Sequence, residues 1–514
     1  MDLSNRILVL LSQMIAIDSQ THTDKEKDIE DFLYDTLRCM GTPVEVHRFP
    51  IPEDPLERTV VTGFVPGSSG DTVLFLNHHD VVSSEDYGVL RDYAFRPEAL
   101  LPQMQAYETD PEVLADLNSG EWMVGRGSCD MKGGAAAQLA VLEEYVHRSR
   151  RKLSLLFISV PDEESYSDGM RAAVSCLKEL KAAKGLNYKL LINCEPNDQE
   201  QGTQVAFTGS VGKLLPLVLV QGKPVHVGAY RQGLNPLGVL ARIIAATEGE
   251  ASLCDQAGGE MTPPPTWVYA RDRKQQYDVS LPQRAAACAN YLTYTKTPED
   301  VLQILVEAAK KAGAEALSHV GPGLTMKVLT YGELVKRAEA YEGFGAFYEQ
   351  ARNRVKEQVA AGESTYVNAT MTLMEQILDF TGIVEPLVVI GFAPPYYPAA
   401  DSLALGADYY SEILEEIKGI LPVRFDSYFN GISDCSYCCI AKDLEPAALT
   451  ANMPLWGKGY GFDIGALQEL AIPFLLLGPW GKDLHERTER VNVESVAKIL
   501  PEILQHILEY LADR

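Results

Sequence analysis

The chain has 514 residues, of which 46% are hydrophobic and 23% are charged, so it has the composition of a globular protein and is too long for one ordinary domain. Its 71 acidic side chains outnumber 45 basic ones and give a formal net charge of -26. A field of this sign repels nucleic acid and anionic membrane surfaces, so we exclude both from the expected partners.

The first 19 residues are predicted to form an amphipathic helix. Apolar residues recur there at helical spacing, and the segment carries Asp2 and Arg6 without the basic start and small-residue cleavage site of an export signal. No stretch of the chain reaches the length of a membrane span. The nine cysteines, an odd number without a regular framework, favour a reducing compartment. We therefore expect a cytoplasmic protein.

Strands and helices alternate up to about residue 212. Short runs of aliphatic residues predict buried strands, and amphipathic segments between them predict helices. This alternation is typical of an α/β fold with a doubly wound, mostly parallel sheet. The expected strands are 72–77, 153–160 and 189–194, and the expected helices are 25–40, 135–148 and 170–181.

The pattern changes after residue 212 and resumes near residue 397. The intervening part carries two proline-rich breaks, at 263–265 and 394–398, and mixes strands with helices. We therefore predict a catalytic domain in two parts, 1–212 and 397–514, interrupted by an inserted α+β domain over 213–396. In the inserted domain we expect strands 214–220 and 385–392 and helices 236–246, 298–312 and 332–361; after it we expect helices 401–418 and 493–511 and strand 473–477.

Histidines and carboxylates follow the predicted strands of the first part. His78-His79-Asp80 ends the first strand, and residues two apart on an extended segment face the same side. Asp80 can therefore accept a hydrogen bond from one ring nitrogen of His78, which fixes the tautomer and turns the other nitrogen towards a metal. A polar loop after a strand is the alternative. Ligands of open α/β sheets bind beyond the carboxyl ends of such strands, so these side chains are expected to converge.

Asp130 lies in a glycine-rich segment, Gly125-Arg126-Gly127-Ser128-Cys129-Asp130-Met131-Lys132-Gly133-Gly134. The glycines allow a tight turn around one carboxylate before the next helix, which suits a ligand that bridges two cations. A phosphate-binding loop is the alternative, although the spacing matches neither the P-loop nor the dinucleotide pattern.

Two adjacent carboxylates, Glu163 and Glu164, follow the second strand. Neighbours on an extended segment point in opposite directions, so one could coordinate a metal while the other takes a proton from water. A solvated acidic turn is the alternative. Glu195 before Pro196 and His485 in the C-terminal part are weak signals alone.

The ordered set of His78-x-Asp80, Asp130-Met-Lys-Gly-Gly, Asp162-Glu163-Glu164, Glu195-Pro, Gly-Lys-x-x-His226-x-Gly and His485 with Glu489 resembles the family of carboxypeptidase G, aminoacylase-1 and succinyl-diaminopimelate desuccinylase. The resemblance implies two zinc ions per chain, with cobalt or manganese as alternatives. His78 and Glu195 would hold one ion, Glu164 and His485 the other, and Asp130 would bridge them. Glu163 would be the general base and Asp80 would orient His78.

The same resemblance implies a role for the inserted domain as lid and dimer contact. His226 would stabilise the oxyanion, often from a partner subunit, and Asn235 would contact substrate. The resemblance also implies a cis peptide after Asp130. Flanking segments such as Asn452-Met453-Pro454-Leu455-Trp456-Gly457 are similar to the arginine-utilisation, RocB-like branch.

A second cluster, Cys435-Ser436-Tyr437-Cys438-Cys439, could be read as a redox or zinc site. A Cys-x-x-Cys without a second pair makes a poor structural zinc site, so we favour buried, reduced thiols. The preceding Ser433-Asp434 is similar to a Ser-Asp pair near the active site of the family. No Gly-x-Ser-x-Gly motif occurs, which gives a serine hydrolase no support.

The sequence thus predicts a zinc-dependent amidohydrolase or metallopeptidase, a homodimer that cleaves an amide bond in a small peptide or an N-acyl amino acid. Glu195 favours carboxypeptidase or deacylase chemistry, and the branch resemblance suggests a substrate from arginine catabolism. An aminopeptidase or dipeptidase of the same family is one alternative. A non-catalytic homologue that keeps the fold for binding is the other.

Overall fold

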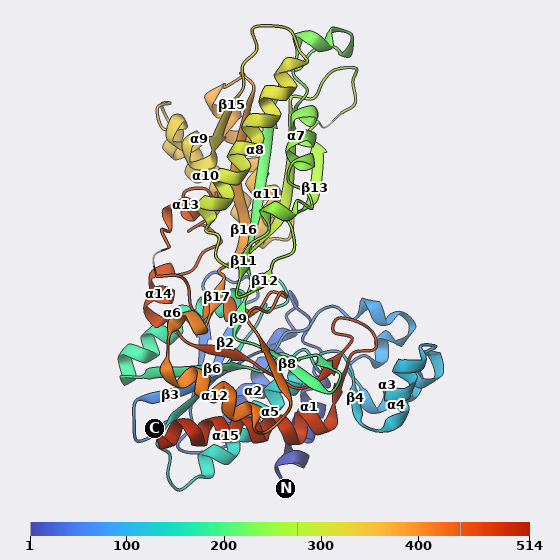
Figure 1. The fold of residues 1–514 in the computed structure, drawn as a ribbon, viewed down its shortest axis with the longest axis vertical. Coiled ribbons are helices and arrows are strands. Elements are labelled where there is room, and N and C mark those ends of the chain that lie inside the picture. Colours follow the sequence, from blue (N-terminus) through green and yellow to red (C-terminus); the bar gives the residue numbers. More distant parts are fainter. Residues whose placement is uncertain (1, 275, 443) are drawn as a thin grey trace. The chain divides into compact units, whose positions relative to one another are not determined.

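The computed structural model describes residues 2–274, 276–442 and 444–514, which form two compact units (Figure 1). The first unit comprises Met1–Ser210, Ala400–Ile440 and Asp463–Arg514, and the second comprises Val211–Ala399 and Ala441–Phe462. The second unit is therefore built from two separate stretches of the chain. No helix within the described residues is long and apolar enough to cross a bilayer.

The first unit contains a nine-stranded sheet. Its four central strands, β5, β3, β6 and β19, are parallel to one another. Antiparallel pairs flank them: β1 with β2 and β2 with β5 on one side, and β19 with β8 and β8 with β7 on the other. The predicted α/β class is confirmed, and the sheet is mixed at both sides of its parallel centre. The strands, in sheet order, are β1 (Glu45–Pro50), β2 (Thr59–Val65), β5 (Ser154–Val160), β3 (Asp71–His78), β6 (Asn187–Asn193), β19 (Phe474–Leu476), β8 (Thr203–Phe207) and β18 (Val423–Asp426), with β7 (Gln199–Glu200) beside β8.

Helices cover both faces of this sheet. Alternate strand residues such as Val73, Phe75 and Phe157 pack with five helices in one continuous apolar core, because side chains along a strand face opposite sides in turn. α6 (Asp168–Lys184) contacts β2 and β5, and α14 (Ile464–Leu470) packs against α6. The helices of the main core are α1 (Leu3–Ile15), α2 (Glu26–Cys39), α5 (Lys132–His147), α12 (Asp408–Lys418) and α15 (Leu500–Asp513).

An insertion between β3 and α5 has a small core of its own, formed by residues such as Tyr87, Leu100 and Leu117. Its final strand joins a three-stranded sheet with the segment that carries His485. The insertion therefore contacts the C-terminal part of the same unit. Its elements are the 3-10 segment Glu85–Tyr93, α3 (Pro97–Tyr107), α4 (Pro111–Ser119) and β4 (Trp122–Val124), and β4 pairs with β21 (Arg490–Asn492) beside β20 (Gly481–Lys482).

The second unit is a five-stranded sheet with helices on it. Leu217, Leu219 and Val389 share a core with α9, α10 and α11. The strand residues that alternate with these face the other side of the sheet, where α7 and α8 pack. The strands, in sheet order, are β13 (Thr266–Asp272), β14 (Arg284–Thr293), β10 (Gly212–Gln221), β16 (Leu387–Tyr397) and β15 (Lys327–Thr330). The helices are α7 (Pro236–Ala245), α8 (Pro298–Ser318), α9 (Tyr331–Ala338), α10 (Phe344–Ala360) and α11 (Tyr366–Thr381).

Several details of the inserted part differ from the sequence prediction. The single helix expected over 332–361 is two helices, because the chain turns before Gly343, whose φ is +80°. α11 and the alanine-rich β14 were not predicted, since alanine gives no strand signal. The expected break at 394–398 lies largely within β16. Beyond Ile390, β16 no longer pairs with β15, so two prolines that cannot donate a backbone N–H are tolerated there.

Residues 441–462 correct the predicted domain boundaries. They fall within the predicted second part of the catalytic domain, 397–514, but they pack on the second unit. The backbone N–H of Phe392 donates to the carbonyl of Asn452 at 2.8 Å, and the N–H of Tyr396 donates to the hydroxyl of Tyr460 at 2.7 Å. These bonds tie the returning segment to β16. The other compact-unit boundaries lie within three residues of 212 and 396.

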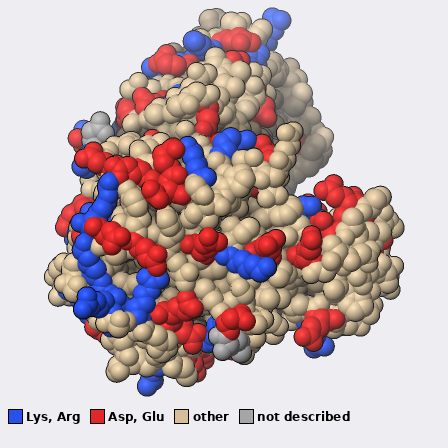
Figure 2. Space-filling model, turned by 60° about the horizontal axis from the view of Figure 1, so that its bottom comes forward, with Lys and Arg blue, Asp and Glu red and all other residues tan. Residues whose placement is uncertain are grey.

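Charged side chains are interspersed on the surface. Figure 2 shows groups of acidic residues interrupted by lysine and arginine on the face turned forward. With a net charge of -26, this surface opposes the approach of polyanions.

Candidate metal centre

The carboxyl ends of three neighbouring strands carry predicted site residues. β3 ends at His78, β5 is followed by the turn over residues 162–164, and β6 is followed by Glu195. β3 lies between the other two, runs parallel to both, and aligns His78 with Val160. Because the carboxyl ends of parallel strands share one edge of a sheet, the side chains that follow them converge there.

Asp130 connects two histidines through its two carboxylate oxygens. Oδ1 lies 3.0 Å from Nε2 of His78, and Oδ2 lies 3.0 Å from Nε2 of His485. The peptide between Asp130 and Met131 is cis, as the family resemblance implies. A carboxylate placed in this way offers one oxygen to each of two adjacent positions, which is what a ligand shared by two cations must do.

A second carboxylate accompanies each histidine. Oε1 of Glu195 lies 3.5 Å from Nε2 of His78, and Oε2 of Glu164 lies 3.1 Å from Nε2 of His485. The structure therefore brings all five predicted ligands together as two pairs that share Asp130.

The donor atoms of this centre fit a divalent cation. Ligand atoms of His78, Asp130 and Glu164 all lie within 4.8 Å of one another. Oε1 of Glu164 is buried without a hydrogen-bond partner, which costs about 1–3 kcal/mol unless another group satisfies it. Imidazole nitrogens and carboxylate oxygens are the ligands that zinc takes in hydrolases. The side chains thus form a potential metal site.

The pKa values show how strongly the two histidines hold protons when no cation competes. Hydrogen bonds that His485 donates to the carboxylates of Asp130 and Glu164 raise its pKa to about 10. Burial lowers the pKa of His78, but Glu195 and Asp130 outweigh it and raise that pKa well above its ordinary value. Burial raises the pKa of Glu164 to about 7. A cation that binds here must therefore displace protons.

Asp80 is held between His78 and the turn that carries the paired glutamates. The Nδ1 atom of His78 lies 3.0 Å from the backbone carbonyl of Asp80 and 3.6 Å from its carboxylate. That carboxylate accepts the backbone N–H groups of Glu163, at 3.1 Å, and Glu164, at 3.2 Å. The ring is thus oriented chiefly by a backbone carbonyl, while the Asp80 carboxylate positions both glutamates.

Glu163, the predicted general base, is partly buried beside this centre. Burial raises its pKa well above the ordinary value; His78 opposes that shift, and the carboxylates of Glu195 and Asp434 add to it. The pKa of Asp434 is itself raised to about 7 by burial. Because the charge of Asp434 contributes to the raised pKa of Glu163, this carboxylate lies close enough to influence the centre electrostatically.

Glu489 organises the loop that presents Asp130. Its Oε2 accepts hydrogen bonds from the guanidinium of Arg126 at 2.9 Å and from the backbone N–H of Gly127 at 3.0 Å. Its Oε1 accepts the backbone N–H groups of Cys129, at 3.2 Å, and Asp130, at 3.3 Å. The sequence placed Glu489 in the family motif without a role, and these contacts identify it as a positioning residue.

The segment that carries His485 is anchored by the α3–α4 insertion. Oδ2 of Asp116, on α4, accepts hydrogen bonds from Nη2 of Arg490 at 2.7 Å and from Nζ of Lys482 at 2.8 Å. Arg490 is buried, and it also donates to the carbonyl of Thr488 at 3.0 Å. These contacts lie on both sides of the turn that carries His485 and hold it in place. Asp116 could not be recognised from its local sequence, because an acidic residue on a helix usually faces solvent.

His226 and Asn235 lie in the second unit. His226 is exposed, and its Nδ1 accepts the backbone N–H of Gly228 at 3.1 Å. The side chain of Asn235 caps α7 by accepting the N–H of Leu237 at 3.1 Å. Asn235 therefore has a structural role, and contact of either side chain with substrate stays a prediction.

The cysteine cluster agrees with the interpretation as buried thiols. Cys435, Cys438 and Cys439 are all buried and free, and of the nine free cysteines only Cys39 is exposed. Burial raises the pKa of Cys439 to about 12, which suppresses the reactive thiolate.

Metal binding is predicted to release protons and to strengthen as pH rises. The raised pKa of His485, about 10, means that this side chain is protonated at neutral pH without a cation and loses its proton when a cation binds. We expect the apparent affinity to increase from pH 6 towards pH 9. Calorimetric titration in buffers of different ionisation enthalpy should show at least one proton released per chain. Equal heats in all buffers would contradict this account.

Substitution of Asp116 is predicted to weaken the half of the centre that contains His485. Asp116→Asn removes the charge that holds Arg490 and Lys482, and loss of such supporting contacts typically costs about 10- to 100-fold in metal affinity. Zinc affinity measured against a competing chelator gives the comparison. Glu112→Gln is the matched control, because Glu112 also contacts Lys482, at 3.4 Å, but is largely exposed. Equal affinities for the two variants would rule out the anchoring role.

Known proteins that resemble this chain belong to a family of peptidases, which agrees with the potential metal site. Residues 74–379 match the family described as Peptidase family M20/M25/M40. Uncharacterized protein YqjN of Bacillus subtilis (strain 168) is 32% identical over 99% of this chain and 96% of its own length, and Protein RocB of the same organism is 29% identical with the same coverage.

Among solved structures, aminopeptidase PepT from Bacillus cereus ATCC 10987 has the same fold, with a TM-score of 0.57, 14% identity and coverage of 99% of both chains. The resemblance to the RocB-like branch is thus confirmed over nearly the whole sequence. On these matches, and with a potential metal site at the edge of its sheet, the chain belongs to peptidase family M20/M25/M40.

Proposed function

We propose that this member of the family is a two-zinc amide hydrolase, with His78 and Glu195 on one ion, Glu164 and His485 on the other, and Asp130 shared by both. The observation that carries the proposal is the position of the Asp130 carboxylate, with each oxygen 3.0 Å from a different histidine. Cobalt and manganese accept the same nitrogen and oxygen ligands and are the alternative ions.

A bound pair of divalent cations supplies Lewis acidity, which polarises the scissile carbonyl and makes a water molecule more acidic. Glu163 takes the proton of the attacking water and transfers it to the leaving nitrogen. Its raised pKa favours the second transfer, because a carboxylate of ordinary pKa would hold the proton too weakly to deliver it. Asp80 keeps Glu163 in place through the backbone N–H bond at 3.1 Å.

The substrate that we propose is a small peptide or an N-acyl amino acid, cleaved in the manner of a carboxypeptidase or deacylase. Similarity to Protein RocB and the net charge of -26 support a cationic substrate from arginine catabolism. His226 would stabilise the oxyanion from the partner of a homodimer, and Asn235 would contact substrate. Buried free thiols support a cytoplasmic location.

A substrate screen separates the candidate reactions. Zinc-loaded protein is given N-acyl amino acids and dipeptides rich in arginine and ornithine, and the products are identified by mass spectrometry. Release of an acyl group indicates a deacylase, and release of a C-terminal amino acid from blocked peptides indicates a carboxypeptidase. Cleavage of free dipeptides alone would favour an aminopeptidase or dipeptidase. Failure of zinc-loaded protein to cleave any amide would instead favour a non-catalytic homologue.

Glu163→Gln is predicted to lower kcat by about 100-fold or more and to leave both zinc ions bound, because loss of a general base typically costs about 10²- to 10⁴-fold. Activity and metal content are measured on the same preparation. Glu98→Gln is the control, since Glu98 is exposed on α3. Unchanged hydrolysis by Glu163→Gln would make the base assignment wrong, whereas loss of zinc would identify Glu163 as a ligand.

A further inference from the structure

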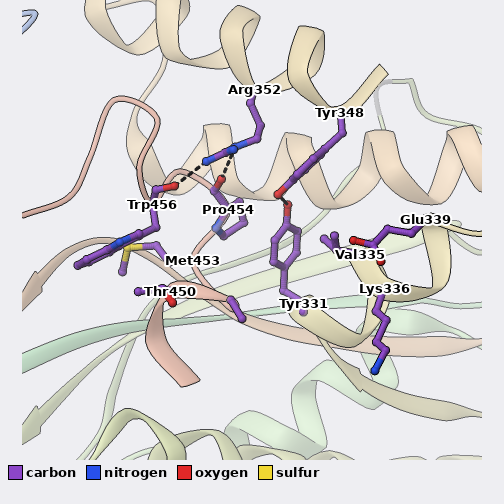
Figure 3. A pocket seen from close by; sticks show the side chains of 12 residues that line it. Tyr331, Val335, Lys336, Glu339, Tyr348, Arg352, Thr450, Met453, Pro454 and Trp456 are labelled. Carbon is purple, nitrogen blue, oxygen red and sulfur yellow. Dashed lines mark hydrogen bonds between the residues drawn. The ribbon is translucent and has the colours of Figure 1, made fainter. Parts of the chain in front are cut away.

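A cavity of about 420 Å³ lies within the second unit, between α9, α10 and the returning segment 441–462 (Figure 3). None of the residues that line it belongs to the metal centre. Its volume is at the lower end of the range of small-molecule sites, which suits a ligand of amino-acid size.

The aromatic wall of this cavity is held in place by contacts of its own. The hydroxyls of Tyr331 and Tyr348 are 2.8 Å apart, and the ring of Tyr348 stacks on Phe344 with centroids 5.3 Å apart. Trp456, on the returning segment, packs edge-on against Phe462 at 5.2 Å. Because these rings are fixed before any ligand arrives, little side-chain freedom remains to be lost on binding.

Arg352 forms the basic side of the cavity. Its Nε donates to the carbonyl of Pro454 at 3.0 Å, its Nη2 donates to the carbonyl of Trp456 at 2.6 Å, and its Nη1 lies 3.4 Å from Glu349. The guanidinium has five N–H groups, so these three contacts leave donors for a further acceptor. An incoming carboxylate suits the remaining donors.

Glu339 forms the acidic side. In Figure 3 its carboxylate points towards the tyrosine pair, and the adjacent lining residue Lys336 points away from it. Glu339 has no ion pair within 4 Å among the described residues. It follows the last residue of α9, where the helix dipole also favours a cation. An acid beside tyrosine rings is a favourable environment for an ammonium or guanidinium group.

We propose that this cavity is a binding site for a free basic amino acid, with the carboxylate of the ligand at Arg352, its methylene stem over the tyrosine pair and its terminal cation at Glu339. The assignment follows from the order of groups along the cavity, which is base, aromatic wall and acid. The site is separate from the proposed function and does not depend on metal or on hydrolysis.

The test uses the zinc-loaded protein and three probes of similar size. L-lysine has both charges, norleucine lacks the terminal cation, and cadaverine lacks the carboxylate. None has an amide bond that the enzyme could cleave. We expect L-lysine to change the fluorescence of Trp456 saturably and to bind at least about tenfold more tightly than either analogue, because each lacks one charged contact. Trp456→Phe should remove the change, while calorimetry still detects binding.

Glu339→Gln should weaken L-lysine binding by about tenfold, because it removes the acceptor charge without changing size. The matched control, Glu342→Gln, removes a neighbouring exposed carboxylate outside the cavity and should bind as the parent does. Equal affinity for L-lysine and norleucine, equal affinity of Glu339→Gln and Glu342→Gln, or no binding at millimolar L-lysine would each overturn the proposal.

Discussion

The Asp130 carboxylate is the interaction on which the site depends. Its two oxygens face His78 and His485, which belong to segments more than 400 residues apart in the chain. In the absence of a cation, the carboxylates of Asp130 and Glu164 raise the pKa of His485 to about 10, and burial raises the pKa of Glu164 to about 7, so protons are held among these side chains. Divalent cations at the proposed positions would replace those protons, and the surrounding structure serves to keep the five side chains in place.

That support comes from two directions. The sheet fixes His78, Glu164 and Glu195, because strand ends in a packed core cannot shift independently. The segments with Asp130 and His485 leave regular structure, and polar contacts hold them instead, buried around Glu489 and partly buried around Asp116. Glu489 accepts four hydrogen bonds from the loop before and at Asp130, and Asp116 binds the arginine that encloses the turn of His485. A buried carboxylate with several donors is costly to disturb, which explains why the loops can be precise without being regular.

Among the residues that meet at the centre, those in local patterns could be singled out directly, whereas Glu195 and His485 were recognisable only from the order of the motifs along the chain. A strand that ends in His78-His79-Asp80, or a glycine-rich turn around Asp130, is visible within ten residues. The supporting residues were not predictable for the opposite reason: Asp116 and Arg490 are 374 positions apart, and neither differs locally from a solvated charge on a helix or strand. The fold shows the same division. Aliphatic strands such as β3 were evident, whereas alanine-rich β14 depends on burial between β10 and β13, and the return of residues 441–462 to the second unit depends on contacts with β16.

The shared position of Asp130 can be tested with an anomalous diffraction map of crystals of the zinc-loaded protein, recorded at the zinc absorption edge. We expect two peaks per chain, about 3.5 to 4 Å apart, with the Asp130 carboxylate between them, His78 and Glu195 at one peak, and Glu164 and His485 at the other. A single peak, or two peaks that do not share Asp130, would contradict it.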